Sequence, residues 1–295
     1  MSSSRSARVR RAPSASLDRG ALERELAAGL AQLHLELPDA AIGKLLDYLA
    51  LLSKWNAVYN LTAVREPRAM LVQHLLDSLA IVAPLAARGA APGNGGEGNG
   101  GEGNGGESNG APRTGAEGEP PGSDAPYRCV VDVGSGGGLP GIVLAIVWPR
   151  TRIHLVEPVG KKAAFLRQCA VELALAHVEV HASRVEELQL GPALAPDLIL
   201  CRAFASLPDF VSGIEALVGP STLVAAMKGV VPRDEIAALG GGWSVAEILP
   251  LQVPLLDAER HLLLLERSAD RGTRARSDTH PDARAHAGRD GPADH

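Results

Sequence analysis

Apolar residues recur at helical spacing through the first third of the chain. Leu22, Leu26 and Leu30 follow one another four residues apart, so they share one face of a helix. Pro38 favours the first turn of a second helix, and a third apolar stretch follows a short polar break. We therefore predict a helical N-terminal subdomain over residues 17–87.

Beyond residue 126, short apolar runs alternate with helical patterns. Strands are expected up to Val133 and at 153–157, 178–181, 198–201, 223–227, 245–251 and 261–266. Helices are expected at 138–147, 160–175 and 208–217. This alternation is typical of an α/β fold with a doubly wound, mostly parallel sheet. Because no helix separates the last two strands, we expect them to form an antiparallel edge of the domain at 127–267.

Three segments lack apolar periodicity. Residues 1–16 are basic and Ser/Ala-rich, residues 88–126 repeat an Asn-Gly-Gly-Glu-Gly unit before a Pro-rich stretch, and residues 268–295 are polar. Such compositions cannot bury enough apolar surface to fold alone. They predict a disordered basic tail, a flexible linker and a disordered C-terminal tail.

Composition excludes several classes of protein. The chain has 295 residues, 45% hydrophobic and 21% charged, with a net charge of −5, which suffices for one sizeable core and a small accessory subdomain. Its three cysteines form no C-x-x-C pair and no cluster with histidine, so we expect no disulfide framework, no metal site and a reducing, cytoplasmic location. No apolar run reaches the length of a membrane span, so no membrane association is expected.

A glycine-dense turn after the first strand carries the clearest chemistry. Glycines let a ligand approach the backbone, and the helix that follows offers free N–H groups. Two spacings overlap here. Gly134, Gly136 and Gly138 after Asp132 form the D-x-G-x-G-x-G pattern of S-adenosylmethionine sites, while Gly136, Gly138 and Gly141 form the G-x-G-x-x-G pattern of dinucleotide sites.

The position of Asp132 favours the first interpretation. A carboxylate at the strand end can hold the charged end of a methionine-like ligand, but it would repel the pyrophosphate of a dinucleotide. The dinucleotide pattern would also begin three residues after the last strand valine, which is late for that turn. An ordinary glycine-rich loop is the remaining alternative. We interpret the loop as a cofactor site for S-adenosylmethionine.

Ligands bind such sheets at the carboxyl ends of the strands, so the residues there are further candidates. Glu157 follows the second strand and could accept hydrogen bonds from a ribose diol, although a strand-end glutamate also occurs by chance. Val185 and Glu186 follow the third strand, where a backbone N–H and a carboxylate could meet an adenine edge. Arg202 follows the fourth strand and offers a fixed cation. Its neighbour Cys201 is not preceded by the proline that cytosine-C5 methyltransferases place before their nucleophilic cysteine, so we interpret it as a packing residue.

Polar residues in the helical part and basic residues near the strand ends suggest a second ligand. Asn60, His74 and Asp77 are hard to explain as core residues, and as a group they could form one wall of a cleft. Aromatic residues make up only 3% of the chain, which argues against a long base-stacking platform. The candidate RNA-binding residues are Arg65, Lys161, Lys162, Arg167, Lys228, Arg260 and His261.

Several colinear motifs together resemble one known family. They are Lys54-Trp55-Asn56-x-x-Tyr59-Asn60-Leu61-Thr62, His74-x-x-Asp77-Ser78, the loop from Asp132 to Ile142, Gly160-Lys161-Lys162, Ser183-Arg184-Val185-Glu186-Glu187, Arg202-Ala203-Phe204-Ala205-Ser206-Leu207, Lys228-Gly229 and Glu259-Arg260-His261-Leu262. The chain is similar in these positions to the bacterial 16S rRNA guanine-N7 methyltransferases, the glucose-inhibited division protein B family. The similarity spans about residues 30–266, and the long linker and both tails depart from it.

The resemblance implies a Rossmann-like class I methyltransferase fold that uses S-adenosylmethionine. It implies methylation of N7 of one guanine, at position 527 in the 530 loop of 16S rRNA, in the small ribosomal subunit or an assembly intermediate. Separately, we expect the protein to be a monomer. Carried over by position, the cofactor residues are Gly134, Leu139, Val185, Glu186 and Arg202, to which the residues above add Asp132, Gly136 and Glu157.

The target atom suggests how the reaction proceeds. Guanine N7 has an in-plane lone pair and no proton, so in-line methyl transfer needs alignment and no dedicated general base. Asn60, His74, Asp77 and Arg202 are expected to position the nucleotide. The alternatives are a methyltransferase acting on a small molecule or another RNA, a nicotinamide-dependent oxidoreductase, and a non-enzymatic RNA-binding module.

Overall fold

The computed structural model describes residues 18–89, 125–191 and 195–268. The predicted basic tail, nearly all of the predicted linker and the predicted C-terminal tail lie outside these residues. The N-terminal part is helical, as predicted. Its elements are α1 (Arg19–Gln32), α2 (Asp39–Tyr59), α3 (Pro67–Met70), the π-helical turn η1 (Leu71–Leu76), α4 (Asp77–Leu79) and α5 (Val82–Gly89).

The rest of the described chain is built around a seven-stranded sheet with the order β3-β2-β1-β4-β5-β7-β6. The strands are β1 (Cys129–Val133), β2 (Arg152–Val156), β3 (Val178–His181), β4 (Leu198–Arg202), β5 (Leu223–Lys228), β6 (Trp243–Pro250) and β7 (His261–Arg267). Strands β1 to β5 are mutually parallel, and β7 is antiparallel to both β5 and β6. This topology confirms the predicted mostly parallel sheet with an antiparallel edge.

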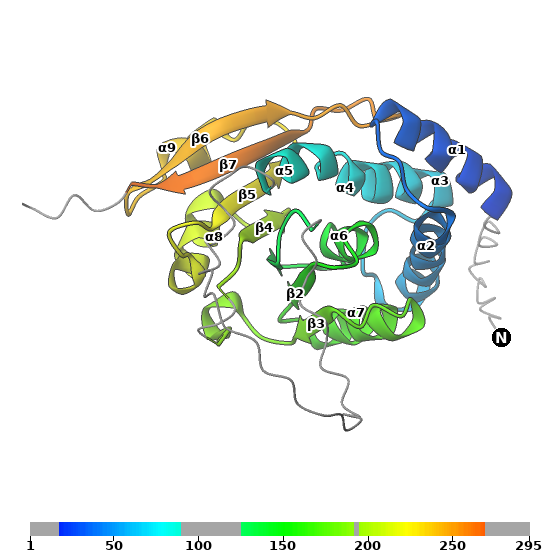
Figure 1. Cartoon of the computed structure of the whole chain (residues 1–295), viewed down its shortest axis with the longest axis horizontal. Coiled ribbons are helices and arrows are strands. Elements are labelled where there is room, and N and C mark those ends of the chain that lie inside the picture. Colours follow the sequence, from blue (N-terminus) through cyan, green and yellow to red (C-terminus); the bar gives the residue numbers. More distant parts are fainter. Residues whose placement is uncertain (1–17, 90–124, 192–194, 269–295) are drawn as a thin grey trace, which may run out of the picture.

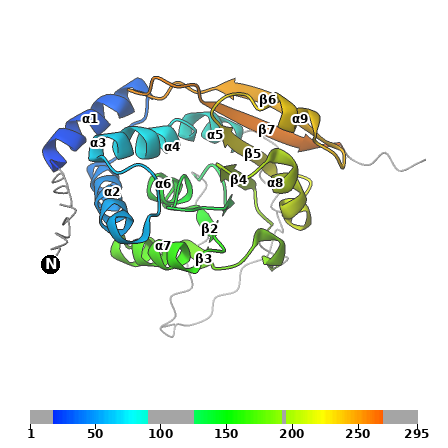
Figure 2. The same ribbon diagram turned by 180° about the vertical axis from the view of Figure 1, so that it is seen from behind.

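The remaining helices connect the strands. They are α6 (Gly141–Val147), α7 (Gly160–Glu172), the 3₁₀ turn η2 (Val185–Glu187), α8 (Leu207–Ile214), the 3₁₀ turn η3 (Glu215–Leu217) and the unpredicted short helix α9 (Arg233–Ala237). Figures 1 and 2 show α6 and α7 on one side of the sheet, with α2 outside them, and α8 on the other side. The N-terminal helices therefore form an outer layer that packs on α6 and α7.

Alternate residues of each central strand belong to two separate hydrophobic cores, because successive side chains of a strand point to opposite faces of the sheet. Val130, Ile153 and Leu155 pack with α6, α7 and the N-terminal helices, whereas Val131 and Ile199 pack with α8. Burial on both faces explains why these strands read as continuous apolar runs.

One stretch corrects the expectation that no apolar run is long enough for a membrane span. The helical run Pro67–Gly89 has the length and hydropathy to cross a membrane. Of its most apolar window, 72% is buried inside the protein. Its apolar residues, such as Leu71 and Leu75, belong to the core that the N-terminal helices share with α6 and the sheet, so it is a core helix.

The two ends of the predicted linker come together at the surface. A Cβ atom on Gly89 would overlap the carbonyl oxygen of Pro126. The Tyr127 hydroxyl donates a hydrogen bond of 2.7 Å to the carbonyl of Leu85. The helical part and the first strand are thus in direct contact where the intervening segment leaves and rejoins the fold.

Candidate cofactor and RNA site

The glycine loop turns sharply at the carboxyl end of β1. Gly134, Gly136 and Gly138 have φ angles of 70°, 58° and 89°, a region that residues with a Cβ rarely adopt. The N–H groups of Gly134 and Ser135 donate to the Val156 carbonyl at 2.9 and 3.1 Å, which holds the loop against β2. Because residues 138–140 belong to this turn, helix α6 begins at Gly141, three residues later than predicted.

Asp132 lies beneath the loop and is fully buried. Its Oδ2 accepts the N–H of Gly141 at 3.0 Å, so the carboxyl holds the start of α6, and Oδ1 has no hydrogen-bond partner among the described residues. Burial raises the pKa of Asp132 to about 7, although the nearby Ser135 side chain and the hydrogen bond from the Gly141 N–H lower it. Direct contact between Asp132 and the cofactor stays a prediction.

Glu157 directly follows β2 and is buried beside the loop. Its two carboxylate oxygens accept the N–H groups of Gly136 and Val159, both at 2.9 Å. A carboxylate has about four lone-pair sites, so Glu157 can still accept hydrogen bonds from a diol. Val185, which is buried, and Glu186, which is exposed, lie in η2 just after β3, at the same end of the sheet.

Helix α2 supports the loop from outside, a contact that the sequence did not predict. The hydroxyl of Tyr48, which is fully buried, donates a hydrogen bond of 2.6 Å to the carbonyl of Gly137. The Leu52 side chain lies where a Cβ on Gly137 would contact it at 3.3 Å. The N-terminal helices therefore hold the glycine loop in place and do more than cover the sheet.

A buried carboxylate joins the helical part to two arginines of the sheet. Asp77 accepts Nη1 of Arg202 on Oδ2 and Nε of Arg260 on Oδ1, both at 2.8 Å. The Asp77 side chain is 3% exposed, whereas those of Arg202 and Arg260 are 19% and 25% exposed, so the guanidinium groups reach the surface. Arg202 ends β4 one residue after the partner of Val133, which places it beside the glycine loop.

His74 extends this network and comes from the π-helical turn. Arg202 Nη2 lies 3.3 Å from His74 Nδ1, and His74 Nε2 lies 3.0 Å from Thr62 Oγ1. Because arginine can only donate, Nδ1 must accept and the proton sits on Nε2. Burial, and then the charge of Arg202, lower the pKa of His74 to about 4, so the ring is neutral at pH 7. We name His74, Asp77, Arg202 and Arg260 the arginine network.

Asn60 lies apart from the arginine network. It ends α2 in the left-handed conformation, and its side chain accepts a hydrogen bond from Arg65 at the surface. Thr62 is the residue of that polar break that reaches His74, and Asn56 holds the break in place by bonding Thr62 N and Val64 O at 2.9 Å. The structure thus brings together three of the four predicted positioning residues.

Two further features of this end of the sheet were not predicted. Ala203 has a φ of 54°, so the residue after Arg202 adopts a conformation that is unusual for a side chain with a Cβ. The ring of Phe204 lies over Gly134, where an added Cβ would approach it to 3.3 Å. The loop and the end of β4 therefore pack directly on each other.

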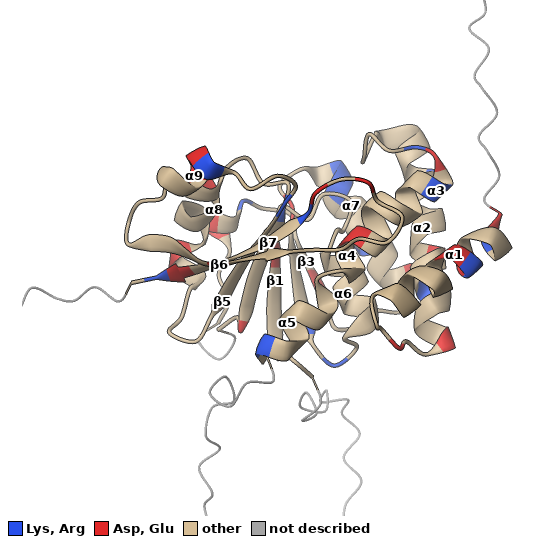
Figure 3. Ribbon diagram, turned by 90° about the horizontal axis from the view of Figure 1, so that it is seen from above, with Lys and Arg blue, Asp and Glu red and all other residues tan. Residues whose placement is uncertain are grey.

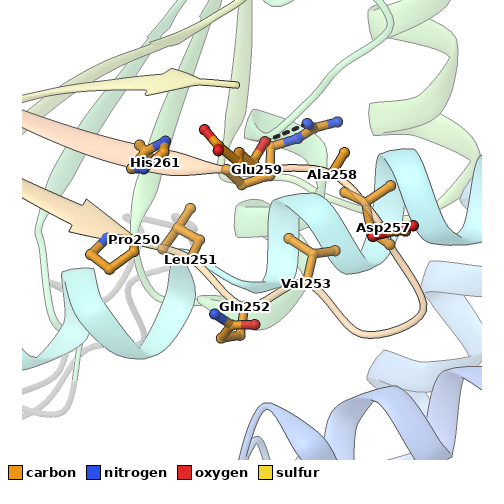
Figure 4. A pocket seen from close by; sticks show the side chains of 10 residues that line it. Pro250, Leu251, Gln252, Val253, Asp257, Ala258, Glu259 and His261 are labelled. Carbon is orange, nitrogen blue, oxygen red and sulfur yellow. Dashed lines mark hydrogen bonds between the residues drawn. The ribbon is translucent and has the colours of Figure 1, made fainter. Parts of the chain in front are cut away.

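The predicted RNA-binding residues divide into paired and exposed groups. Lys228 forms an ion pair of 2.8 Å with Glu235, and His261 Nδ1 lies 2.6 Å from the Gly229 carbonyl. A cavity of about 410 Å³ beside Arg260 and His261 is lined by the β6–β7 connection (Figure 4).

Helix α7 carries three of the predicted basic residues, of which Lys161 and Arg167 are exposed and Lys162 is partly buried. Lys161 and Lys162 lie in its first turn, which holds no acidic residue, and Arg167 follows two turns on, with Nη2 3.3 Å from the Val180 carbonyl. Basic segments beside α7 are visible in Figure 3. Cations at a helix N-terminus oppose the helix dipole, so this placement weakens the helix and favours a role in binding anions.

Comparison with known proteins decides the family. A family model described as rRNA small subunit methyltransferase G matches residues 41–91 and 122–263. Relatives from Burkholderia lata and Burkholderia ambifaria, both named Ribosomal RNA small subunit methyltransferase G, are 46% identical over 257 residues, covering 86% of this chain and 96% of each relative. This chain belongs to the rRNA small subunit methyltransferase G family. The resemblance stated from the motifs is confirmed.

Membership makes the chain an S-adenosylmethionine-dependent methyltransferase. Among solved structures, TrmN from Thermus thermophilus is similar over 48% of this chain and 44% of its own, with 20% identity and a TM-score of 0.38. The family match skips residues 92–121, so most of the predicted linker is an addition to the shared fold.

The residues at the loop fit S-adenosylmethionine. Three glycines with positive φ leave the backbone open to close approach, and Glu157 at the end of β2 retains hydrogen-bonding capacity for hydroxyl groups. Arg202 offers a cation for a carboxylate. The residues that would hold the cofactor are Gly134, Gly136, Leu139, Glu157, Val185, Glu186 and Arg202.

Proposed function

We propose that this protein methylates N7 of one guanine in the 530 loop of 16S rRNA, at position 527, within the small ribosomal subunit or an assembly intermediate in the cytoplasm. The observation that carries the proposal is the arginine network beside the glycine loop. It joins the helical part and the sheet, and the family match covers both parts. The relatives' printed name supports the rRNA substrate.

The chemistry of guanine N7 sets what the protein must do. S-adenosylmethionine supplies an electrophilic methyl group on a sulfonium sulfur when it is bound. Guanine N7 has a free lone pair and no proton, so no residue has to remove one, and the rate depends on orientation and on exclusion of water. The pKa of His74, lowered to about 4, makes it a weak base, and Asp77 is held between two guanidinium groups, so neither is arranged as a general base.

Arg202 is the residue best placed to orient the base. The guanine edge that carries N7 also carries O6, and both are hydrogen-bond acceptors. Asp77 and His74 occupy one side of the Arg202 guanidinium and leave it partly exposed. We assign Arg202 to O6 or an adjacent phosphate, Arg260 to the RNA backbone, and Asp77 to holding both arginines in place.

The groove geometry of RNA restricts the substrate. In paired RNA the N7 edge lies in a deep, narrow groove that side chains reach poorly. The target must therefore be a loop nucleotide that can turn out of its stack. Lys161, Lys162 and Arg65 are assigned to the phosphates around the target nucleotide.

The test is methyl transfer from labelled S-adenosylmethionine to small subunits from cells that lack the endogenous activity, followed by mapping of the modified base. We expect label at one guanine N7 in the 530 loop. Label at another nucleotide would overturn the assigned site. Normal binding of S-adenosylhomocysteine with no labelling of free 16S rRNA or subunits would overturn the RNA substrate and favour a small-molecule acceptor.

A further inference from the structure

Two imidazoles and one carboxylate meet on the sheet outside the cofactor and RNA site. His154 lies in β2, and Glu179 and His181 lie in the neighbouring edge strand β3. In the strand register His154 pairs with Glu179, and His181 follows two residues on, so all three side chains lie on one face. That face is opposite the one on which Ile153 and Leu155 pack with α6 and α7.

The distances within this cluster match those of ligands around one metal ion. His154 Nδ1 and His181 Nε2 are 3.0 Å apart, and Glu179 oxygens lie 3.6 Å from His154 Nδ1 and 3.8 Å from His181 Nε2. Zinc binds imidazole nitrogen at about 2.0–2.1 Å, which puts two ligands of a tetrahedral ion about 3.3 Å apart. The three observed separations between potential ligand atoms, 3.0, 3.6 and 3.8 Å, are close to that ligand–ligand distance.

The burial of the three side chains gives a formed site with an entrance. The His154 side chain is 1% exposed and that of His181 is 19% exposed, so the strands and their surroundings fix both rings. The Glu179 side chain is 62% exposed and leaves a path from solvent.

A hydrogen bond between the two imidazoles explains part of the arrangement only. It accounts for the 3.0 Å contact between the rings, since one nitrogen can donate to the other. It does not account for Glu179, whose two oxygens approach the same two nitrogens. A shared cation accounts for all three contacts.

We propose that His154, Glu179 and His181 bind one divalent transition-metal ion, with Zn²⁺ the best match to two imidazoles and a carboxylate. The ion links the edge strand β3, only four residues long, to β2. The same strand pair carries Glu157, whose N–H donates to the His181 carbonyl at 3.0 Å. The site is therefore structural, and it stabilises the strands that place Glu157. The proposal does not depend on the RNA substrate.

The test is calorimetric titration of Zn²⁺ alone into the metal-stripped full chain, with thermal unfolding measured in parallel. Because His280, His286 and His295 could also bind zinc, the titrations use a background in which these three are Gln. In that background we expect one Zn²⁺ per chain and a higher Tm with zinc. Glu179→Gln and His181→Gln should each weaken Zn²⁺ binding at least about tenfold and abolish the rise in Tm.

Controls separate the site from misfolding and from nonspecific binding. His34→Asn removes an exposed histidine elsewhere, in a left-handed conformation that Asn tolerates, and should leave zinc binding unchanged. Normal S-adenosylhomocysteine binding shows that each variant is folded, and Glu179→Gln carries the test if His181→Gln unfolds. Unchanged Zn²⁺ affinity in folded Glu179→Gln, or no binding in the background chain, overturns the proposal.

Discussion

The glycine loop and the arginine network lie side by side at one end of the sheet, but they are built in opposite ways. The loop is a continuous stretch of backbone whose shape depends on three glycines with positive φ. The network consists of side chains: Asp77 meets Arg202 and Arg260, which are 125 and 183 positions away in the sequence. A local backbone site is visible in a short motif, whereas a long-range side-chain site exists only once the fold is formed.

The two regions also fail in different ways when they are altered. The loop depends on glycines with positive φ, so substitutions there act through backbone strain, and at Gly138 also through steric overlap. The network depends on one buried carboxylate, so its loss leaves two cations without their shared partner. Each variant below tests whether the loop serves the cofactor and the network serves the RNA.

The largest effect is expected from Asp77→Asn. The amide keeps the shape but removes the charge that holds both arginines, and misplacement of orienting groups costs about 100-fold in kcat/KM. S-adenosylhomocysteine binding, measured by calorimetry, should weaken much less than kcat/KM, because Arg202 is only one of the residues that would hold the cofactor. The control Asp47→Asn breaks an exposed pair with Arg19 and should leave activity unchanged. Methyl transfer by Asp77→Asn at the wild-type rate would remove the network from the RNA site.

Among the three loop glycines with positive φ, Gly138→Ala should be the most damaging substitution. Its Cβ would lie 2.6 Å from Ile142 Cγ1 and 3.0 Å from Leu166 Cδ2, at a φ of 89°. We expect a loss of about 2–4 kcal/mol in the free energy of unfolding and weaker cofactor binding, measured by urea unfolding and calorimetry.

Substitutions of two other glycines serve as controls for the stability loss in Gly138→Ala. Gly136→Ala meets nothing closer than 3.7 Å, so only conformational strain of about 1–2 kcal/mol applies. Gly160→Ala lies at the start of α7 with nothing within 4 Å and should be neutral or slightly stabilising. Equal losses at Gly138 and Gly136 would contradict the steric explanation.

Asp132→Asn tests the buried carboxyl through pH. The pKa of Asp132 in the folded protein, about 7, lies above its ordinary value of 3.8, so the folded state holds the proton more tightly. The contribution of Asp132 to the free energy of unfolding should therefore fall as pH rises from about 4 to about 7. In urea unfolding, the free energy of unfolding of the wild type should therefore fall relative to that of Asp132→Asn as the pH rises from 5 to 8. A constant gap between the two would show that Asp132 is ionised throughout.

Tyr48→Phe should have a moderate effect, because it tests the link between the two regions. It removes one buried hydrogen bond to the loop and leaves the ring in place, at a cost of about 1 kcal/mol. We expect a few-fold weaker binding of S-adenosylhomocysteine. Tyr59→Phe, at a more exposed position of the same helix, is the control. An unchanged cofactor Kd would mean that α2 does not support the loop.

Lys161→Gln and Lys162→Gln should have the smallest effects. Each removes one cation at the start of α7, so RNA affinity should fall a few-fold and the slope of its salt dependence should decrease by about one per lysine that contacts phosphate. Cofactor binding should not change. An unaltered salt slope in the double variant would exclude α7 from the RNA surface.

The sequence predicted which segments form strands and where the glycine loop lies, because both depend on local patterns. The end of β1, both limits of β3 and the start of β4 lie where the apolar runs and turns predicted them, and the sheet is mostly parallel as predicted. The start of α6 was misplaced because three residues with helical spacing belong to the turn. In the candidate site, the position of Arg202 was predicted from the rule that ligands bind at strand ends.

The contacts within the site could not be predicted in the same way. The π-helical turn Leu71–Leu76 has no sequence pattern of its own, yet it places His74 toward Arg202. Thr62, rather than Asn60, reaches His74 because the turn after α2 directs the side chains differently. The cluster of His154, Glu179 and His181 depends on the pairing of two strands, which the spacing of its residues does not reveal.

The contact between Gly89 and Pro126 has a consequence for how this chain can change over time. Because the two ends of the insertion already touch, a longer insertion costs the folded state only the entropy of closing a loop. This cost is about 0.6 kcal/mol for each doubling of the loop length. Insertions at this point are therefore nearly neutral for the folded core, and selection has little physical reason to remove them. Shortening residues 90–124 to a tight turn should leave the enzyme intact, which makes this position a natural place to attach a reporter domain.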